Sequence, residues 1–352
     1  MSTHAPTEPA RIAEAMDGAA PRCMVVMYHY VHDRDALARP GAPGIHGGLR
    51  GLTVADFCTQ LDRLCAAMEP IDWPTLYAWM EGRAEIPQRS FLLTFDDGLA
   101  DHAETVLPIL EDRGLRGAFF VPGAVLTTHR MLPTHAIHLL LSILGESALE
   151  TELRAYFSDR GVRQWCHWLD QRPPEEDAAA ETMYHYETPT LARLKYLLTM
   201  KLPLDLRAAA VEELFESHVG LSSRWARHWY LGWDDLVKMQ SQGHTIGGHG
   251  HGHEPYNRLT PDEARQDILQ AANVLREGLG PDARPFSFPY GRYNASAITA
   301  CREVGFAHAF TTQARWLERH ADPGCLPRFD TSDVKAVLRE EVACLVLPSG
   351  MK

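Results

Sequence analysis

Two short segments of the 352-residue chain carry side chains that suit a metal centre. Asp96 and Asp97 follow the apolar run SFLLTF, and His249, His251 and His253 alternate with glycine in GGHGHGHEP. Adjacent carboxylates repel each other unless a cation or a proton compensates their charge. On a helical or turn-like segment, histidines four residues apart point to one side and the histidine between them points elsewhere. In an extended segment, all three imidazoles would share one face.

Two histidines and one carboxylate match the ligand set of a catalytic metal, because three protein ligands leave a position open. Such a metal acidifies bound water and polarises a carbonyl, and the remaining aspartate is then free to act as a general base. Two simpler interpretations stay open. The aspartates could cap the following helix, and the histidines could lie in a solvated loop. The presence of both groups in one chain favours the metal site.

The predicted secondary structure brings these groups to one end of a sheet. Short apolar runs predict buried strands at residues 24–31, 90–98, 117–123, 244–251, 285–291, 307–312 and 342–348. Helical patterns separate most of these runs, which predicts parallel βαβ units in a barrel or a doubly wound sheet. In both folds the chemistry collects at the carboxyl ends of the strands. Five polar residues stand at those ends: His29, Asp96, Asp97, His249 and Tyr290.

One long stretch interrupts the alternation of strands and helices. Residues 128–230 contain helical patterns and no clear strand, which predicts a helical insertion that covers the mouth of the barrel as a cap. Within this insertion, the solvated surface is the expected place for four residues: His135, His138, Arg193 and Lys195. Residues 1–20 are predicted to be a flexible lead-in, and residues 21–352 to be a single catalytic domain.

The composition excludes several classes of function. The net charge is −12 and no basic run occurs, so nucleic acid is not an expected partner. The N-terminus lacks the apolar core of a secretion signal, and no run of about 18 apolar residues predicts a membrane span. Seven cysteines without a C-x-x-C pair are typical of reduced thiols, which predicts a cytoplasmic location. The oligomeric state is not readable from the sequence.

Three motifs occur in the order TFDDG (94–98), H-x-x-x-H (249–253) and FPYG (288–291). Together they resemble the polysaccharide deacetylase family, the NodB-type enzymes of carbohydrate esterase family 4. The resemblance implies an α/β fold, a distorted (β/α)7 barrel, that hydrolyses an N-acyl or O-acyl group from a sugar. Carried over by motif, it makes Asp96 the general base and Asp97, His249 and His253 the metal ligands. The backbone N–H of Tyr290 would stabilise the oxyanion.

The chain departs from the family pattern in three places. Gly250 stands where Ser or Thr usually steadies the loop, so that His251 or water would have to replace the lost hydrogen bond. Ser287 stands where an arginine usually poises the base, and Arg328 in CLPRFD is the predicted substitute. The family's late histidine, a general acid, is absent from the last apolar run. His29, at the end of the first strand, is the candidate for that role, with a packed structural histidine as the alternative.

Two further residues are candidates for contact with the substrate. Arg50 lies in the Gly-rich GGLRGLT loop, and Pro289 lies in the FPYG turn. The MYHYV start, the GLRGL loop and the cap resemble cytosolic family members linked to surface-polysaccharide assembly. The resemblance therefore implies removal of an acetyl or formyl group from an amino sugar carried on a nucleotide or a lipid.

The expected metal is Zn²⁺, with Co²⁺, Ni²⁺, Mn²⁺ and Fe²⁺ as alternatives, because affinity alone does not select among them. Two other functions stay open. The first is hydrolysis of a small cyclic amide or ureide. The second is a protein that binds metal and sugar with impaired catalysis, which the missing arginine and the missing late histidine motivate.

Overall fold

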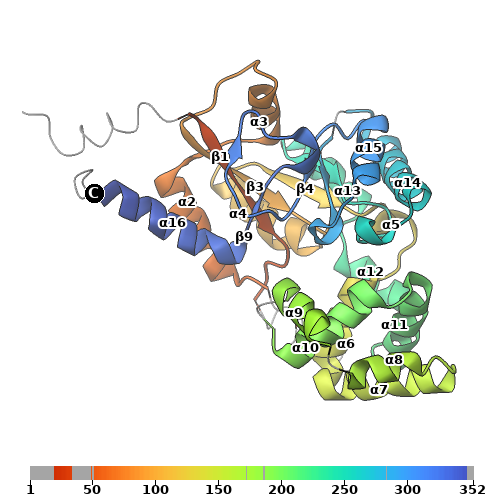
Figure 1. The fold of residues 1–352 in the computed structure, drawn as a ribbon. Helices are drawn as coiled ribbons and strands as arrows, with labels where there is room; N and C mark the ends of the chain where they lie inside the picture. The colour runs from red at the N-terminus through yellow and green to blue at the C-terminus, as the bar shows by residue number, and fades with distance from the viewer. Residues whose placement is uncertain are drawn as a thin grey trace, which may run out of the picture.

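The computed structural model describes residues 20–33, 49, 51–171, 173–184, 187–282 and 284–346 (Figure 1). The predicted lead-in at residues 1–20 lies outside these ranges except for its last residue. The strands are β1 Arg22–Tyr28, β2 Glu69–Pro70, β3 Arg89–Phe95, β4 Gly117–Val121, β5 Thr245–Gly248, β6 Phe286–Ser287, β7 Ala309–Phe310, β8 Leu317–Glu318 and β9 Phe329–Asp330.

The helices that cover the sheet are α2 Val54–Ala67, α3 Trp73–Met80, η2 His102–Val106, α4 Leu107–Asp112, α5 Gly123–Thr127, α13 Trp233–Ser241, α14 Pro261–Leu279, α15 Ala295–Glu303 and α16 Thr331–Val346. Short turns of 3-10 helix lie at η4 Tyr256–Arg258, η5 Pro289–Gly291 and η6 Pro323–Cys325. None of the helices in the described part of the chain has the length and apolar character needed to cross a membrane.

The sheet has the order β7-β6-β5-β4-β3-β1-β8, and all its neighbours are parallel except β1 and β8. The segment that includes Leu326 and β9 closes the circle. Leu326 bridges to Phe310 of β7, and β9 pairs in parallel with Val26 and Met27 of β1. This segment therefore joins β7 to β1, at the two sides of the parallel sheet, and makes the sheet a distorted barrel.

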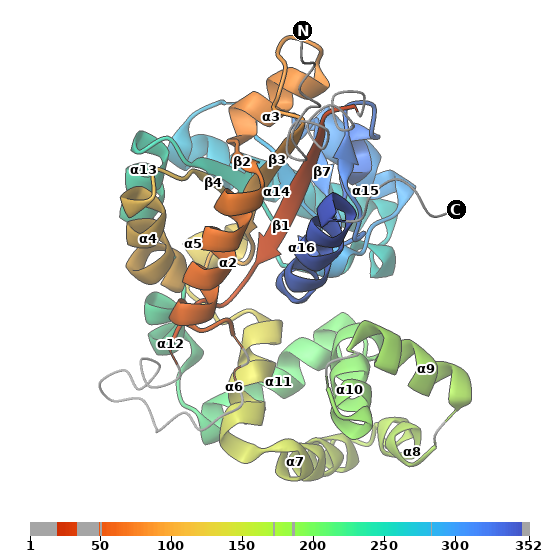
Figure 2. The same cartoon turned by 90° about the vertical axis from the view of Figure 1, so that its left-hand side faces the viewer.

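The strand predicted at residues 342–348 is wrong. Residues Thr331–Val346 form helix α16, which contacts α2 and β1 and lies beside α2 in Figures 1 and 2. Its apolar residues recur at helical spacing, and Val334 and Leu338, four residues apart, are both buried. The helix continues through the apolar run VACLV. The prediction failed because a short apolar run, considered by itself, is compatible with either a strand or part of a helix.

The central strands are buried on both faces, which explains their almost continuous apolar sequences. β1 (RCMVVMY) pairs with β3 (RSFLLTF) along its whole length. The rings of Tyr28, Phe95 and Phe119 stack across β1, β3 and β4, with neighbouring centroids 5.2 and 4.6 Å apart. Asp96 follows β3 directly, and its N–H donates to the carbonyl of Tyr28 at 2.9 Å. The core therefore fixes the backbone from which the two aspartates project.

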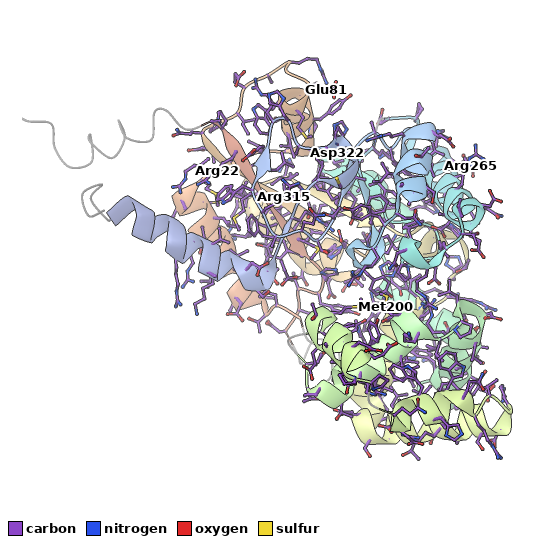
Figure 3. The ribbon with its side chains drawn as sticks, viewed as in Figure 1. Arg22, Glu81, Met200, Arg265, Arg315 and Asp322 are labelled. Atoms are coloured by element: carbon purple, nitrogen blue, oxygen red, sulfur yellow. The ribbon has the colours of Figure 1, made fainter. Side chains whose placement is uncertain are left out.

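A helical cap lies beyond the carboxyl ends of the strands, as the two views in Figures 1 and 2 agree. Its helices are α6 Pro133–Leu144, α7 Glu146–Asp159, α8 Gln164–Asp170, α9 Pro174–Met183, α10 Pro189–Tyr196, η3 Leu197–Lys201, α11 Leu204–His218 and α12 Ser222–Trp229. Arg258 of the barrel donates to the carbonyls of Thr199 and Leu202, on either side of Met200, which Figure 3 shows at the boundary. Arg207 of α11 pairs in return with Glu254.

Glycines in β5 allow its neighbours to approach closely. A Cβ atom on Gly247 would lie 2.6 Å from the carbonyl oxygen of Pro285 and 2.7 Å from the ring of Phe120. A Cβ atom on Gly248 would lie 2.6 Å from the ring of Phe306. The two glycines that precede His249 therefore belong to a regular, tightly packed strand, and the turn begins only after them.

We expect Gly247→Ala to lower the free energy of unfolding by about 1–3 kcal/mol, because the added methyl group overpacks β5 against backbone. Denaturant unfolding of the two proteins measures the change. Gly232→Ala is the control, because Gly232 is exposed and a Cβ atom there would meet only Asp235, at 3.7 Å. Equal unfolding midpoints for wild type and Gly247→Ala would contradict the packing described for β5.

Candidate active site

Three turns at the mouth of the barrel hold non-glycine residues in the left-handed backbone region. Asp97 follows β3 with a φ of 78°, His253 follows β5 with 57°, and Tyr290 follows β6 with 57°. In the described chain only one other non-glycine residue, His129, has a positive φ. Such conformations cost about 1–3 kcal/mol each and cluster at functional sites. The strain therefore marks the same three turns that the sequence motifs mark.

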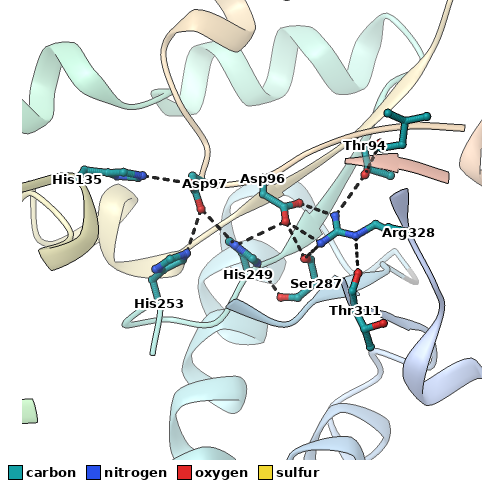
Figure 4. A network of polar contacts seen from close by, with 10 residues as sticks. Thr94, Asp96, Asp97, His135, His249, His253, Ser287, Thr311 and Arg328 are labelled. Carbon is teal, nitrogen blue, oxygen red and sulfur yellow. Dashed lines mark hydrogen bonds and ion pairs between the residues drawn. The ribbon is translucent and has the colours of Figure 1, made fainter. Parts of the chain in front are cut away.

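Asp97, His249 and His253 form a compact, buried group at these turns. Each offers one ligand atom, and the three atoms lie within 4.8 Å of one another. The Nε2 atoms of His249 and His253 lie 3.3 and 3.0 Å from Oδ1 of Asp97, as Figure 4 shows. The two histidines four residues apart thus share one side of the turn, as predicted from their spacing.

The donor set fits a divalent cation. Oδ1 of Asp97 is buried and has no hydrogen-bond partner among the residues that the structure describes, although it faces two imidazole nitrogens. A buried oxygen without a partner is costly, and a metal ion bound among these three atoms would satisfy it. Burial alone would raise the pKa of Asp97, but His253, His135 and His249 outweigh it and hold that pKa well below its usual range. Burial lowers the pKa of His253 to about 4, which keeps its imidazole neutral, as a metal ligand must be.

His249 is oriented by the strand beside it. Its Nδ1 lies 2.7 Å from the carbonyl oxygen of Ser287, which can only accept a hydrogen bond. Nδ1 therefore carries the proton, and the lone pair of Nε2 faces Asp97. Burial opposes the charged form of His249, but the carboxylates of Asp96 and Asp97 outweigh it and raise the pKa of His249.

His251 takes no part in this group. The carboxylate of Asp267, on α14, accepts the N–H groups of His251 and Gly252 and the hydroxyl of Tyr256, at 2.9, 2.7 and 2.6 Å. Gly250 has a φ of 70°, and a Cβ atom there would lie 2.7 Å from the Tyr256 hydroxyl. Asp267 therefore steadies the loop in place of the missing Ser or Thr, a role that no local motif signals.

Asp96 is held by a buried arginine. Nη1 and Nη2 of Arg328 donate to Oδ1 and Oδ2 of Asp96, each at 2.8 Å (Figure 4). The hydroxyl of Ser287 donates to Oδ2 of Asp96 at 3.1 Å and accepts from Nη2 of Arg328 at 2.8 Å. Thr94 and the carbonyl of Thr311 take the other donors of the guanidinium. The predicted contact between Arg328 and the candidate base is therefore present.

Electrostatics keep Asp96 ionised. Burial by itself would raise the pKa of Asp96, but Arg328 and His249 outweigh it, with a smaller contribution from His29, and lower it to about 2. The arginine lies in the segment that closes the barrel, between Leu326 and β9. The carboxylate is therefore ionised at neutral pH, and its orientation depends on closure of the sheet.

The remaining candidates have different surroundings. His29 is partly buried at the end of β1, and its carbonyl accepts a hydrogen bond from Nε2 of His102 at 3.0 Å. The ring of Tyr290 lies 5.0 Å from that of His253, and burial raises the pKa of Tyr290 to about 12, so that its hydroxyl stays protonated. Pro289 is buried within η5. Arg50 lies outside the described residues.

The cap contributes residues that the sequence analysis placed wrongly. His135 is fully buried, and its Nε2 lies 3.1 Å from Oδ2 of Asp97. The expectation of a solvated His135 is therefore wrong, because the fold brings to it a carboxylate 38 residues away in sequence. Arg193 and Lys195 are also buried, paired with Asp177 and Glu187, instead of solvated.

We expect Arg328→Met to lower the free energy of unfolding by about 3–5 kcal/mol, because it leaves the Asp96 carboxylate buried without its partner. The control is Arg302→Met, which removes an ion pair with Asp322. Both side chains of this pair are 54% exposed, so the control should lower the free energy of unfolding by at most about 1 kcal/mol. Denaturant unfolding measures both variants. A loss for Arg328→Met no larger than that of the control would refute the described compensation.

The comparisons with known proteins agree with this arrangement. The family model described as polysaccharide deacetylase matches residues 83–154 and 212–309. The stretch between the two matched parts lies in the cap. The chain therefore carries a polysaccharide deacetylase domain of the NodB type, interrupted by helices, and this family places it among the hydrolases of carbon–nitrogen (amide) bonds. The search of curated proteins found no match.

Solved structures share the fold at low sequence identity. IcaB from Ammonifex degensii is 15% identical with a TM-score of 0.54, over 92% of this chain and 98% of that one. The Streptococcus pyogenes deacetylase PplD in complex with acetate is 13% identical with a TM-score of 0.53, over 94% and 100%. A de-N-acetylase from Aggregatibacter actinomycetemcomitans is 14% identical with a TM-score of 0.53, over 88% and 94%. The predicted distorted NodB-type barrel is confirmed.

Proposed function

From the polysaccharide deacetylase domain that the chain carries, we propose a metal-dependent hydrolase that removes an N-acyl group, acetyl or formyl, from an amino sugar. One observation carries the proposal. The imidazoles of His249 and His253 face the unsatisfied Oδ1 of Asp97, and Asp96 lies beside this group with both its oxygens held by Arg328. A three-ligand site next to an oriented carboxylate is suited to hydrolysis of an amide.

Each residue has a distinct role in this proposal. Asp97, His249 and His253 hold the metal, with Zn²⁺ expected and Co²⁺, Ni²⁺, Mn²⁺ or Fe²⁺ as alternatives. When bound, the metal supplies an acidified water and a polarised acyl carbonyl. Asp96 accepts a proton from the attacking water, and the N–H of Tyr290 stabilises the negative charge that develops on the acyl oxygen.

A proton must also reach the leaving amine. His29 is the candidate donor, because it stands at the end of β1 and is one of the groups that lower the pKa of Asp96. Pro289 shapes the turn that presents the Tyr290 N–H, and Arg50 is a candidate for contact with an anionic carrier group. The pairing of Arg328 with Asp96 supports an active enzyme over a catalytically impaired binding protein, since the base does not lack its arginine.

The proposed substrate is an amino sugar carried on a nucleotide or a lipid, used in surface-polysaccharide biosynthesis. The enclosure of the site supports a short substrate. Asp96, Asp97, His249 and His253 are at most 5% exposed, and the cap lies over the mouth of the barrel. A single sugar at the end of a carrier can enter such a site more readily than a polymer lying across it. A nucleotide-linked substrate would place the reaction in the cytoplasm.

Purified protein is expected to release free amine from N-acetyl or N-formyl nucleotide sugars, and Asp96→Asn is expected to lower kcat by about 10²–10⁴-fold, the usual contribution of a general base. Asp112→Asn, on the exposed end of α4, is the matched control and should keep full activity. A panel of cyclic amides and ureides is assayed in parallel. Hydrolysis of these compounds alone would overturn the sugar assignment, and equal rates for wild type and Asp96→Asn would overturn the enzyme assignment.

Removal of metal provides a second test. Dialysis against a chelator should abolish amine release by the wild type, and stoichiometric Zn²⁺ or Co²⁺ should restore it. Asp97→Ala should not recover activity at the same metal concentration, because the one carboxylate ligand is lost. Full activity of protein shown by elemental analysis to be metal-free would refute metal dependence.

A further inference from the structure

A histidine of the cap reaches the candidate metal ligand from the side away from the barrel. His135 lies on α6 with its ring fully buried, and its Nε2 is 3.1 Å from Oδ2 of Asp97. Its Nδ1 is 2.7 Å from the hydroxyl oxygen of Tyr230, which in turn accepts the N–H of Leu132 at 2.9 Å. Four groups thus form one continuous hydrogen-bonded chain that ends at Asp97, and Figure 4 shows its last link.

The chemistry of the groups sets the direction of this chain. The N–H of Leu132 can only donate, so the Tyr230 oxygen accepts there and its own O–H is free to donate to Nδ1 of His135. A carboxylate without its proton can only accept, so Nε2 of His135 donates to Oδ2 of Asp97. In this arrangement every donor of the chain meets an acceptor, and His135 holds its proton on Nε2.

The result divides the two oxygens of Asp97. Oδ2 is occupied by the His135 N–H. Oδ1 faces Nε2 of His249 and of His253 and has no hydrogen bond within the described part of the chain. Oδ1 is therefore the one oxygen of Asp97 that is available to a metal ion bound between the two imidazoles. A carboxylate that is free on both sides could rotate or bind through both oxygens.

The backbone around Asp97 is also tied to the cap. The N–H of Leu231 donates to the carbonyl of Gly98 at 2.9 Å, and the N–H of Ala100 donates to the carbonyl of Trp229 at 2.9 Å. Tyr230, between these two, pairs with Leu99 in an antiparallel bridge. The exit of the cap therefore pairs with the residues that directly follow Asp97, whose own φ of 78° needs such support.

We propose that His135, oriented by Tyr230, is a positioning residue that fixes Asp97 as a one-oxygen metal ligand, so that the helical cap completes the metal centre. This inference rests on the proposed function, because it assumes that Asp97 binds a metal. It assigns to the cap a role besides covering the substrate. Hydrogen bonds of this kind, from a neighbouring side chain to a metal ligand, typically change metal affinity by about 10–100-fold.

The test compares metal binding by the full-length apoprotein and its variants. The Kd for Co²⁺ is measured by competition with a chromophoric chelator, and the visible absorption spectrum of the Co²⁺ protein is recorded. We expect His135→Leu to weaken binding by about 10–100-fold. We also expect an altered Co²⁺ spectrum, because the freed Oδ2 can enter the coordination sphere. His135→Gln, whose amide N–H can take the place of Nε2–H, should restore both the Kd and the spectrum.

The matched control is His138→Leu, one turn further along α6. The ring of His138 lies 6.2 Å from that of His135, and its Nδ1 contacts the hydroxyl of Tyr30 at 3.4 Å, not Asp97. This variant should bind Co²⁺ with the wild-type Kd. An equal loss in His138→Leu and His135→Leu would overturn the inference, because the effect would then come from general damage to α6.

The remaining outcomes separate the inference from the proposed function. If the wild type binds no Co²⁺, the proposed metal site fails and the inference fails with it. If the wild type binds Co²⁺ and His135→Leu matches it in Kd and spectrum, only the inference is overturned. If His135→Leu does not fold, Tyr230→Phe tests the same chain, because it removes the O–H that holds His135. An unchanged Kd and spectrum in that variant would overturn the inference.

Discussion

The burial of two consecutive carboxylates at the end of β3 is the constraint on which the site depends. Asp96 and Asp97 are 2% and 5% exposed, and moving an ion out of water costs several kcal/mol unless partners replace the hydration. The fold supplies a different kind of partner to each. Asp96 receives a permanent cation through both oxygens, whereas Asp97 receives imidazole groups and, among the described residues, no arginine or lysine.

This difference favours Asp97 over Asp96 as the ligand of the proposed metal. Arg328 occupies both oxygens of Asp96, so a second cation at those atoms would meet a guanidinium already in place. Of the described residues, two histidines face Oδ1 of Asp97 with their imidazole nitrogens, and His249 lies nearer to this atom, at 3.3 Å, than to Asp96, at 3.9 Å. The proposed division of labour between base and ligand, which the family motif implies, would thus follow from the placement of one arginine.

Much of the site could be predicted from the sequence because its parts are local. The DDG turn, the four-residue step from His249 to His253 and the FPYG turn are each encoded within a few residues. Arg328 could be predicted because Ser287 stands where the family usually has an arginine, so another arginine is expected to contact the base. Asp267 and His135 could not be predicted, since neither lies in a motif and each acts through a contact across 15 to 38 residues. The strand predicted at residues 342–348 failed because a short apolar run does not distinguish a strand from part of a helix.

The partners of the two aspartates also come from distant parts of the chain. Arg328 lies 232 residues after Asp96, in the segment that joins β7 to β1, and His135 lies in an insertion that leaves and re-enters the barrel. The site is therefore complete only when the barrel has closed and the cap has docked. Contacts this distant carry a loop-closure cost, and they repay it only when several form together. In this chain, the two buried carboxylates are therefore stable only in the completed tertiary fold.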